Sequence, residues 1–304
     1  MRVLVTGACG FVGRHLITEL VSRGHTAYGI DLGTAPAGLP VQDFLAVDIC
    51  DGKAMTAAVQ RIAPDACVHL AAVAFVPAGK SAPVKMVEVN VMGTTRLLEA
   101  FRCTGSSARI LFISTAQVYG SQPRPAPARE QDPLAPDSLY GITKSAADGI
   151  ARFYARQYGM DILVARPYNH IGPGQDSGYV ISSFAHQVRA IRQGAPPLVK
   201  VGNLESLRDF TDVRDICRAY ALLLEKGVKG EAYNIASGQQ VKIGDVLNGL
   251  CALAGVHPEI VRDEALYRPD DRCLMLDISL LRKTTGWAPV IPFAQTLADI
   301  MEHG

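Results

Sequence analysis

The sequence lacks a strong charge of either sign and a long apolar segment. Its 30 Lys and Arg residues against 29 Asp and Glu residues leave a formal net charge of +1, so it offers no general electrostatic surface for nucleic acid. No apolar run approaches the roughly 18 residues that a membrane-spanning helix needs. The N-terminus runs directly into a β-type segment and shows no signal-peptide pattern. These absences predict a cytoplasmic protein that binds neither nucleic acid nor a membrane.

Cysteine chemistry is also restricted. The seven cysteines are scattered, odd in number and contain no Cys-x-x-Cys pair, which excludes the usual zinc spacings and disfavours a disulfide framework. We therefore expect reduced, mostly buried thiols and no metal site. Hydrophobic residues make up 48% of the 304 positions, which is enough for a sizeable core and argues against disorder.

Short β-type segments alternate with helical periodicity, which predicts a doubly wound parallel sheet with helices on both faces. The expected strands are Arg2–Thr6, Thr26–Ile30, Phe44–Val47, Ala66–Leu70, Ile110–Ile113, Ile162–Ala165 and Ala232–Ile235. The expected helices are Phe11–Val21, Gly52–Ile62, Val84–Cys103, Ser138–Tyr158, Val180–Gln193, Val213–Glu225, Ile243–Leu253 and Phe293–Met301. A proline-rich loop is expected over 123–136.

A glycine turn connects the first expected strand to the first helix. Gly7, Gly10 and Gly13 would permit a tight turn, the approach of a pyrophosphate and close helix–strand packing. Asp31 ends the second strand, where a carboxylate accepts hydrogen bonds from an adenosine ribose and repels a 2′-phosphate. The pattern predicts a Rossmann-type core that binds NAD(P)H, with NADH favoured. The alternative for Asp31 is a carboxylate that merely begins a turn.

Three polar residues indicate redox chemistry. Tyr140 and Lys144 stand four residues apart on one expected helix, so both share a face, and an ammonium near a phenol lowers its pKa. Thr115 follows the strand Ile110–Ile113, at the sheet edge where open α/β folds bind ligands. It could hold a carbonyl or hydroxyl that undergoes redox chemistry, although a helix cap is the alternative for Thr115 alone. Together they predict a catalytic Thr–Tyr–Lys set.

In this order the motifs resemble the extended short-chain dehydrogenase/reductase family, specifically its nucleotide-sugar branch. The matching segments are TGACGFVG at 6–13, HLAAVAFV at 69–76, NVMGT at 90–94, STAQVYG at 114–120, YGITK at 140–144 and RPYN at 166–169. The resemblance implies an NAD(P)H cofactor and a nucleotide-sugar substrate, with a GDP-linked sugar favoured. It also implies a homodimer formed through the helices Val84–Cys103 and Ser138–Tyr158.

The resemblance divides the chain and assigns residues to each part. Residues 1–167, rejoined by about 212–238, would form the cofactor core, and 168–211 with 239–304 a smaller C-terminal α/β lobe for the nucleotide sugar. The cofactor would contact Gly7, Gly10, Phe11, Val12, Asp31, Asp48, Ile49, Leu70, Ala71, Ala72, Asn90, Tyr140, Lys144 and Pro167. The nucleotide sugar would contact Asn169, Val180, Lys200, Arg208, Arg268 and Asp271.

Two assignments keep a plain structural alternative. Arg208 and Arg268 carry forked donors suited to a diphosphate, but each could instead form a surface ion pair. His170 is either an acid/base group or a histidine that packs and braces its loop.

Three functions remain open. The favoured one is NAD(P)H-dependent reduction of the C4 keto group of a nucleotide-linked 4-keto-6-deoxyhexose, above all GDP-4-keto-6-deoxy-D-mannose to GDP-D-rhamnose. Ala116 and Gln117 stand where dehydratases of this family carry proton-shuttling residues, and neither can shuttle a proton. The alternatives are an NAD-dependent UDP-sugar 4-epimerase and a nonenzymatic NAD-binding relative; the latter is disfavoured because Tyr140 and Lys144 are both present. The nucleotide base and the C4 stereochemistry stay open.

Overall fold

The main sheet has seven parallel strands, and its order reverses beside the first strand. The computed structural model describes residues 1–74, 78–122, 124–267 and 273–303. The strand order is β10-β6-β5-β4-β1-β2-β3. The strands are β1 (Arg2–Thr6), β2 (Thr26–Asp31), β3 (Asp43–Ala46), β4 (Ala66–His69), β5 (Arg109–Ile113), β6 (Ile162–Pro167) and β10 (Ala232–Ile235). All seven expected strands are confirmed, and the order is that of a doubly wound Rossmann-type sheet.

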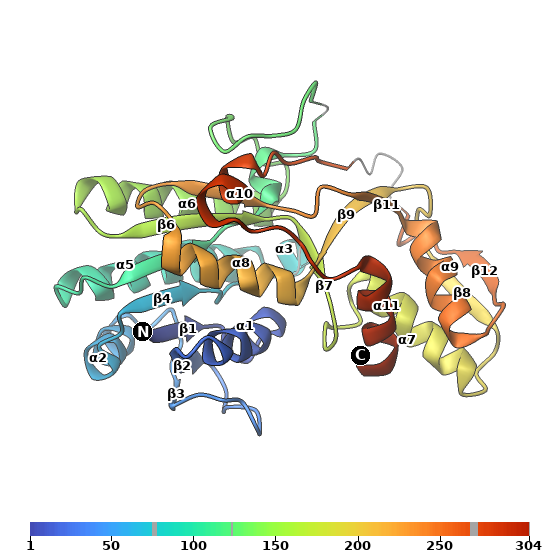
Figure 1. Cartoon of the computed structure of the whole chain (residues 1–304), viewed down its shortest axis with the longest axis horizontal. Helices are drawn as coiled ribbons and strands as arrows, with labels where there is room; N and C mark the ends of the chain where they lie inside the picture. Colours follow the sequence, from blue (N-terminus) through green and yellow to red (C-terminus); the bar gives the residue numbers. More distant parts are fainter. Residues whose placement is uncertain (75–77, 123, 268–272, 304) are drawn as a thin grey trace.

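Helices cover both faces of this sheet, as Figure 1 shows. On one face α1 (Phe11–Ser22) and α8 (Val213–Lys226) bury residues such as Leu16 and Ile216 in one apolar core. On the other face a second core holds apolar residues of α2 (Gly52–Ile62), α5 (Thr94–Cys103) and α6 (Leu139–Gln157). The strands β1, β4, β5 and β6 contribute alternate side chains to the two cores, because successive strand residues point to opposite faces.

The single helix expected over Val84–Cys103 is wrong in its middle. The short helix α3 (Ala78–Ser81) precedes this stretch, and α4 (Pro83–Val87) begins it. The chain then continues as a π-helix, η1 (Glu88–Gly93), and returns to α-geometry in α5. Single π-turns inside a helix are rare and occur frequently at functional sites. The wider turn carries Asn90, whose side chain pairs with the backbone of Val73 in the loop after β4.

The second half of the chain adds a separate group of elements with its own core, gathered at one end of the molecule in Figure 1. Its helices are α7 (Val180–Arg192), α9 (Ile243–Ala254) and α11 (Phe293–His303). Its strands, none of which the sequence predicted, are β7 (Asn169–Ile171), β8 (Leu198–Val201), β9 (Leu207–Asp212), β11 (Gln240–Lys242) and β12 (Glu259–Arg262). They form two small sheets, β11-β9-β7 and β12-β8.

One segment of the range 239–304 packs elsewhere. The helix α10 (Ser279–Thr285) and the flanking residues Leu276 and Trp287 belong to the core that α1 and α8 share. Trp287 is 1% exposed, and its indole N–H donates to the carbonyl of Asp215 in α8 at 2.9 Å. The C-terminal chain therefore crosses from the second group of elements to the main sheet and back.

The cysteines are less buried than expected. All seven thiols are free, but only Cys67 and Cys217 are buried, because the others lie in turns, loops and near helix ends. The structure holds no cluster of three or more His, Cys, Asp or Glu side chains able to bind a metal ion within its described residues. Over the same residues it has no helix long and apolar enough to cross a membrane.

Candidate active site

In the glycine turn between β1 and α1, the positions of Gly7 and Gly13 have no room for a side chain. Gly7 has a φ of +73°, and a Cβ built there would lie 2.8 Å from the backbone nitrogen of Ala71. A Cβ on Gly13 would lie 2.2 Å from the carbonyl oxygen of Gly7. Gly10 is the N-cap of α1 and supplies no side-chain acceptor to the first turn. This open helix N-terminus fits a diphosphate, since it presents N–H groups and the positive end of the helix dipole.

Asp31 lies against this turn. One carboxylate oxygen accepts from the backbone N–H of Cys9 at 2.8 Å, and the other accepts from the N–H of Leu32 at 2.8 Å. The side chain therefore ties the end of β2 to the glycine turn. A carboxylate oxygen has more than one lone pair, so both still have acceptor capacity for a ribose hydroxyl.

Thr115 and Tyr140 meet at the carboxyl end of β5. Thr115 is 7% exposed and caps the 3₁₀-helix η2 (Ala116–Tyr119), accepting from the N–H of Gln117 at 3.2 Å. Its side chain is also hydrogen-bonded to that of Tyr140. Burial raises the pKa of Tyr140 to about 12, the Thr115 hydrogen bond opposes this, and nearby Tyr179 adds to it. The phenol of Tyr140 therefore stays protonated across the physiological range. Thr115 is therefore a helix cap, and its expected contact with a substrate oxygen stays a prediction.

Lys144 lies one turn further along α6 and is only 3% exposed. Its Nζ lies 4.6 Å from the centroid of the Phe112 ring, in cation–π contact. Burial lowers the pKa of Lys144 to about 7, and the carboxylate of Asp148 opposes that change. The amine therefore titrates near neutral pH. Among the described residues, the groups that shift the pKa of Tyr140 do not include Lys144.

A buried ion pair beneath Lys144 was missed by sequence reasoning. Asp148 and Arg166 are both fully buried and share two hydrogen bonds of 2.9 and 3.1 Å. Arg166 also donates to the hydroxyl of Tyr119 at 2.8 Å, and that hydroxyl donates to Asn234 at 2.7 Å. The network joins α6, β6, η2 and β10. An acidic residue one turn after Lys144, on a buried helix face, was the signal available in the sequence.

The other residues expected at the cofactor lie around the carboxyl ends of β1 to β6. Asn90 accepts from the N–H of Val73 at 2.8 Å and donates to the Thr143 hydroxyl at 3.1 Å. Asp48 accepts from the N–H of Cys50, and Ile49 is buried. The remaining ones are placed by their elements: Phe11 and Val12 begin α1, Leu70, Ala71 and Ala72 follow β4, and Pro167 ends β6.

The residues expected at the nucleotide sugar are spread over the second group of elements. The Asn169 amide donates to the carbonyl of Asp209 at 3.3 Å, which joins β7 to β9. Val180 begins α7 and is 42% exposed, and Lys200 is exposed on β8. Arg208 is half-buried on β9, and burial lowers the pKa of its guanidinium. Arg268 and Asp271 lie outside the described residues.

His170 packs rather than faces an open site. Its ring stacks on Phe11, with centroids 6.3 Å apart and planes inclined by 10°, and Nδ1 donates to the carbonyl of Tyr168 at 3.1 Å. Burial lowers its pKa, so the imidazole is neutral. Arg14 of α1 also donates to the carbonyl of Gly174 at 3.1 Å. These contacts hold the segment after β6 against the start of α1, which matches the bracing interpretation.

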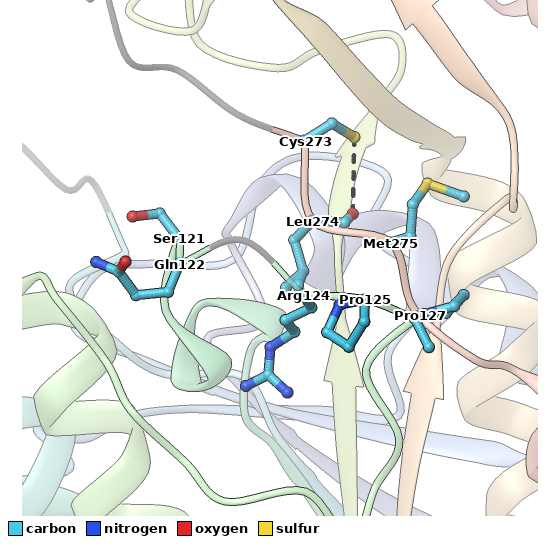
Figure 2. Close-up of a pocket in the computed structure, with 9 residues that line it drawn as sticks. Ser121, Gln122, Arg124, Pro125, Pro127, Cys273, Leu274 and Met275 are labelled. Atoms are coloured by element: carbon cyan, nitrogen blue, oxygen red, sulfur yellow. Dashed lines mark hydrogen bonds between the residues drawn. The ribbon is translucent and has the colours of Figure 1, made fainter.

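A cavity of about 330 Å³ lies between the loop after η2 and the segment that leads into α10 (Figure 2). Its lining includes Arg124, Cys273 and Met275, and none of Thr115, Tyr140 and Lys144. Arg124 is paired with Asp132 at 3.0 Å, and the Cys273 thiol donates to the carbonyl of Leu274. The Arg124 guanidinium and the Cys273 thiol are therefore engaged within the protein, and the cavity lining is distinct from the residues Thr115, Tyr140 and Lys144.

The fold and the site together define an NAD(P)-dependent oxidoreductase of the Rossmann type. The chain belongs to the GDP-mannose 4,6-dehydratase family, whose model matches residues 4–300. It is 36% identical over 303 residues to the GDP-6-deoxy-D-mannose reductase of Pseudomonas aeruginosa, covering 99% of this chain and 96% of the relative.

Solved structures agree with this membership. RMD from Pseudomonas aeruginosa complexed with NADPH superposes with a TM-score of 0.86 at 34% identity, covering 99% of this chain and 98% of its own. The UDP-glucose 4-epimerase of Thermus thermophilus, in complex with NAD, superposes with a TM-score of 0.86 at 31% identity, covering 100% of this chain and 98% of its own. Relatives of both kinds therefore hold a nicotinamide cofactor on this fold.

Proposed function

We propose that the protein reduces the C4 keto group of a nucleotide-linked 4-keto-6-deoxyhexose with NAD(P)H, converting GDP-4-keto-6-deoxy-D-mannose to GDP-D-rhamnose. The proposal rests on which side chains of the site can carry a proton. It pairs one proton donor, the partly buried Tyr140, with a hydroxyl partner, Thr115, and the positions after Thr115 hold Ala116, fully buried, and Gln117. The side-chain oxygen of Gln117 accepts from Ser138 at 3.3 Å. Elimination of water needs additional proton carriers, whereas ketone reduction needs one.

The chemistry divides between cofactor and protein. When bound, the nicotinamide supplies a hydride. Tyr140 donates its phenolic proton to the carbonyl oxygen of the substrate, and its raised pKa keeps it protonated until that moment. Thr115 orients the same oxygen through its hydroxyl. Lys144 donates hydrogen bonds towards the cofactor ribose. The lowering of the Tyr140 pKa by Lys144 that the sequence predicts is wrong, because burial dominates and raises that pKa.

The binding groups follow from the same division. The glycine turn holds the cofactor diphosphate on the N-terminus of α1, and Asp31 accepts from the adenosine ribose, which favours NADH over NADPH. Residues 1–167 with about 212–238 form this half. The lobe of 168–211 and 239–304, apart from the segment around α10 that packs on the main sheet, holds the nucleotide sugar, with Arg208 on its diphosphate. The further contacts proposed there are Asn169, Val180, Lys200, Arg268 and Asp271.

We propose a cytoplasmic homodimer. Exposed apolar side chains follow the helical stretch from α4 to η1 and the outer face of α6: Val84 is 79% exposed, Met92 45%, Ile142 50% and Phe153 47%. Apolar side chains exposed along neighbouring helices mark an interaction surface. A second copy of the chain would bury them in a bundle of α5 and α6 with their counterparts.

A nucleotide-sugar 4-epimerase is the second candidate, because a UDP-glucose 4-epimerase superposes over the whole chain. An epimerase returns its hydride within each turnover and therefore consumes no added cofactor. The deciding assay offers GDP-4-keto-6-deoxymannose with NADH or NADPH, follows the absorbance of the reduced cofactor, and identifies the sugar product. Stoichiometric oxidation supports the reductase. Redox-neutral conversion of a UDP-hexose, with NAD retained through purification, would refute it.

A further inference from the structure

His69, the last residue of β4, lies between the glycine turn and the helix that carries Asn90. Its side chain is 1% exposed, and it uses both ring nitrogens. Nδ1 lies 2.7 Å from the hydroxyl of Thr6, the residue before Gly7. Nε2 lies 3.0 Å from the hydroxyl of Thr94, the first residue of α5. The imidazole therefore bridges two elements that the sequence separates by more than eighty residues.

The neighbouring hydrogen bonds fix the direction of this bridge. The Thr94 hydroxyl donates to the carbonyl of Asn90 at 2.7 Å, so it can only accept from Nε2–H. Nδ1 then carries no proton and accepts from the Thr6 hydroxyl, whose oxygen accepts in turn from the N–H of Ala71 at 3.3 Å. Each donor in this series of hydrogen bonds is thereby matched with one acceptor. Burial and the charge of Lys144 lower the pKa of His69 to about 3, which agrees with a permanently neutral ring.

The chain of hydrogen bonds continues to the catalytic helix. The Asn90 amide donates to the Thr143 hydroxyl at 3.1 Å, and that hydroxyl donates to the carbonyl of Tyr140 at 2.9 Å. Thr6 stands at the glycine turn at one end, and Tyr140 stands at the other. Because the links are directional and buried or partly buried, a shift of one end is resisted along the whole path.

We propose that His69 is a positioning residue that holds the glycine turn and the start of α6 in fixed relation through the hydroxyls of Thr6 and Thr94. The proposal rests on the proposed function. The Thr6 arm sets the turn that receives the cofactor diphosphate. The Thr94 arm, through Asn90 and Thr143, sets the position of Tyr140 relative to the substrate carbonyl.

Two isosteric variants test the hydrogen bonds of His69 with Thr6 and with Thr94 separately. Thr6→Val is expected to raise the Kd of NAD(P)H at least about fivefold, as the loss of one buried hydrogen bond predicts, with kcat at saturating cofactor little changed. Thr94→Val is expected to lower kcat at least about fivefold with the Kd unchanged within about twofold. Cofactor binding is read by the fluorescence of NAD(P)H on titration, which requires no substrate.

Partial replacements of the histidine supply the rescue test. His69→Asn keeps an acceptor near the position of Nδ1 and is expected to recover cofactor affinity better than His69→Leu. His69→Gln keeps a donor near the position of Nε2 and is expected to recover kcat better than His69→Leu. Thr285→Val is the matched control: Thr285 is 4% exposed and hydrogen-bonded within α10 and to Trp287, so it should lower stability without altering Kd or kcat.

The outcomes are distinguishable. The proposal is overturned if Thr6→Val and Thr94→Val change Kd and kcat together, or only in step with their loss of stability as Thr285→Val does. It is also overturned if Asn and Gln at position 69 behave like Leu. If the wild-type protein turns over no nucleotide sugar at all, the proposed function fails. The fluorescence titration of Thr6→Val and His69→Asn then still decides the cofactor arm.

Discussion

Replacing Lys144 by Met is expected to stabilise the cofactor-free protein while removing its activity. The side chains have similar volume, and the site is 3% exposed against the ring of Phe112. Burial lowers the pKa of Lys144 from 10.5 to about 7, so the folded state holds the charged amine at a cost. A displacement of that size corresponds to about 5 kcal/mol in total, because each pKa unit is worth about 1.4 kcal/mol.

The sign of the pH dependence follows from proton binding. Between pH 7 and 10.5 the unfolded chain holds the Lys144 proton and the folded chain has released it, so the stability of the wild type rises with pH in this window. The advantage of Lys144→Met should therefore be about 4 kcal/mol near pH 7.5 and about 2 kcal/mol near pH 9.

The measurement is urea unfolding of cofactor-free protein at pH 7.5 and pH 9, with the exposed Lys283→Met as the matched control. The contributions of the other titrating groups to stability cancel in this comparison, because the wild type and both variants share those groups. The stability gain of Lys144→Met over the wild type is expected to be about 2 kcal/mol larger at pH 7.5 than at pH 9. The stability change of the control is expected to be nearly the same at both pH values. Parallel pH profiles of wild type and Lys144→Met, or a variant less stable at both pH values, would refute the reasoning. Retained turnover in Lys144→Met would refute its place in the site.

Three further predictions concern single groups. Tyr140→Phe should lower kcat at least about a hundredfold with cofactor Kd unchanged, since only the proton donor is lost; near-normal turnover would contradict the role. Asp148→Asn should cost about 3–5 kcal/mol in urea unfolding because it leaves buried Arg166 without a counter-charge, whereas Asp161→Asn, at a partly exposed pair, should cost less than about 1 kcal/mol. Asp31→Asn should shift the Kd ratio towards NADPH at least about tenfold, because the charge that repels a 2′-phosphate is removed; an unchanged ratio would remove Asp31 from cofactor selection.

Local patterns predicted most of the main sheet. Each strand from β1 to β6 is a short apolar run bounded by turn residues, and the helices between them bury one face, so both signals are local. The short strands β7, β8 and β12 were missed because runs of three or four residues in Gly- and Pro-rich surroundings carry little periodicity. The π-turn at Asn90 was missed because the Asn90 side chain pairs there with the backbone of Val73, which belongs to another loop.

By itself, the sequence determined the doubly wound sheet, the glycine turn and the shared helix face of Tyr140 and Lys144, because spacing along one strand or helix sets which side chains share a face. Thr115 lies on another element, and only the fold brings it to Tyr140. Only the tertiary structure decided the protonation of these groups. The pKa of Lys144 near 7 and that of Tyr140 near 12 come from burial beneath helices and strands that are distant in the chain. The same holds for His69, an unassigned part of a motif in the sequence: its two threonine partners come from β1 and α5, and only folding brings them to its two nitrogens.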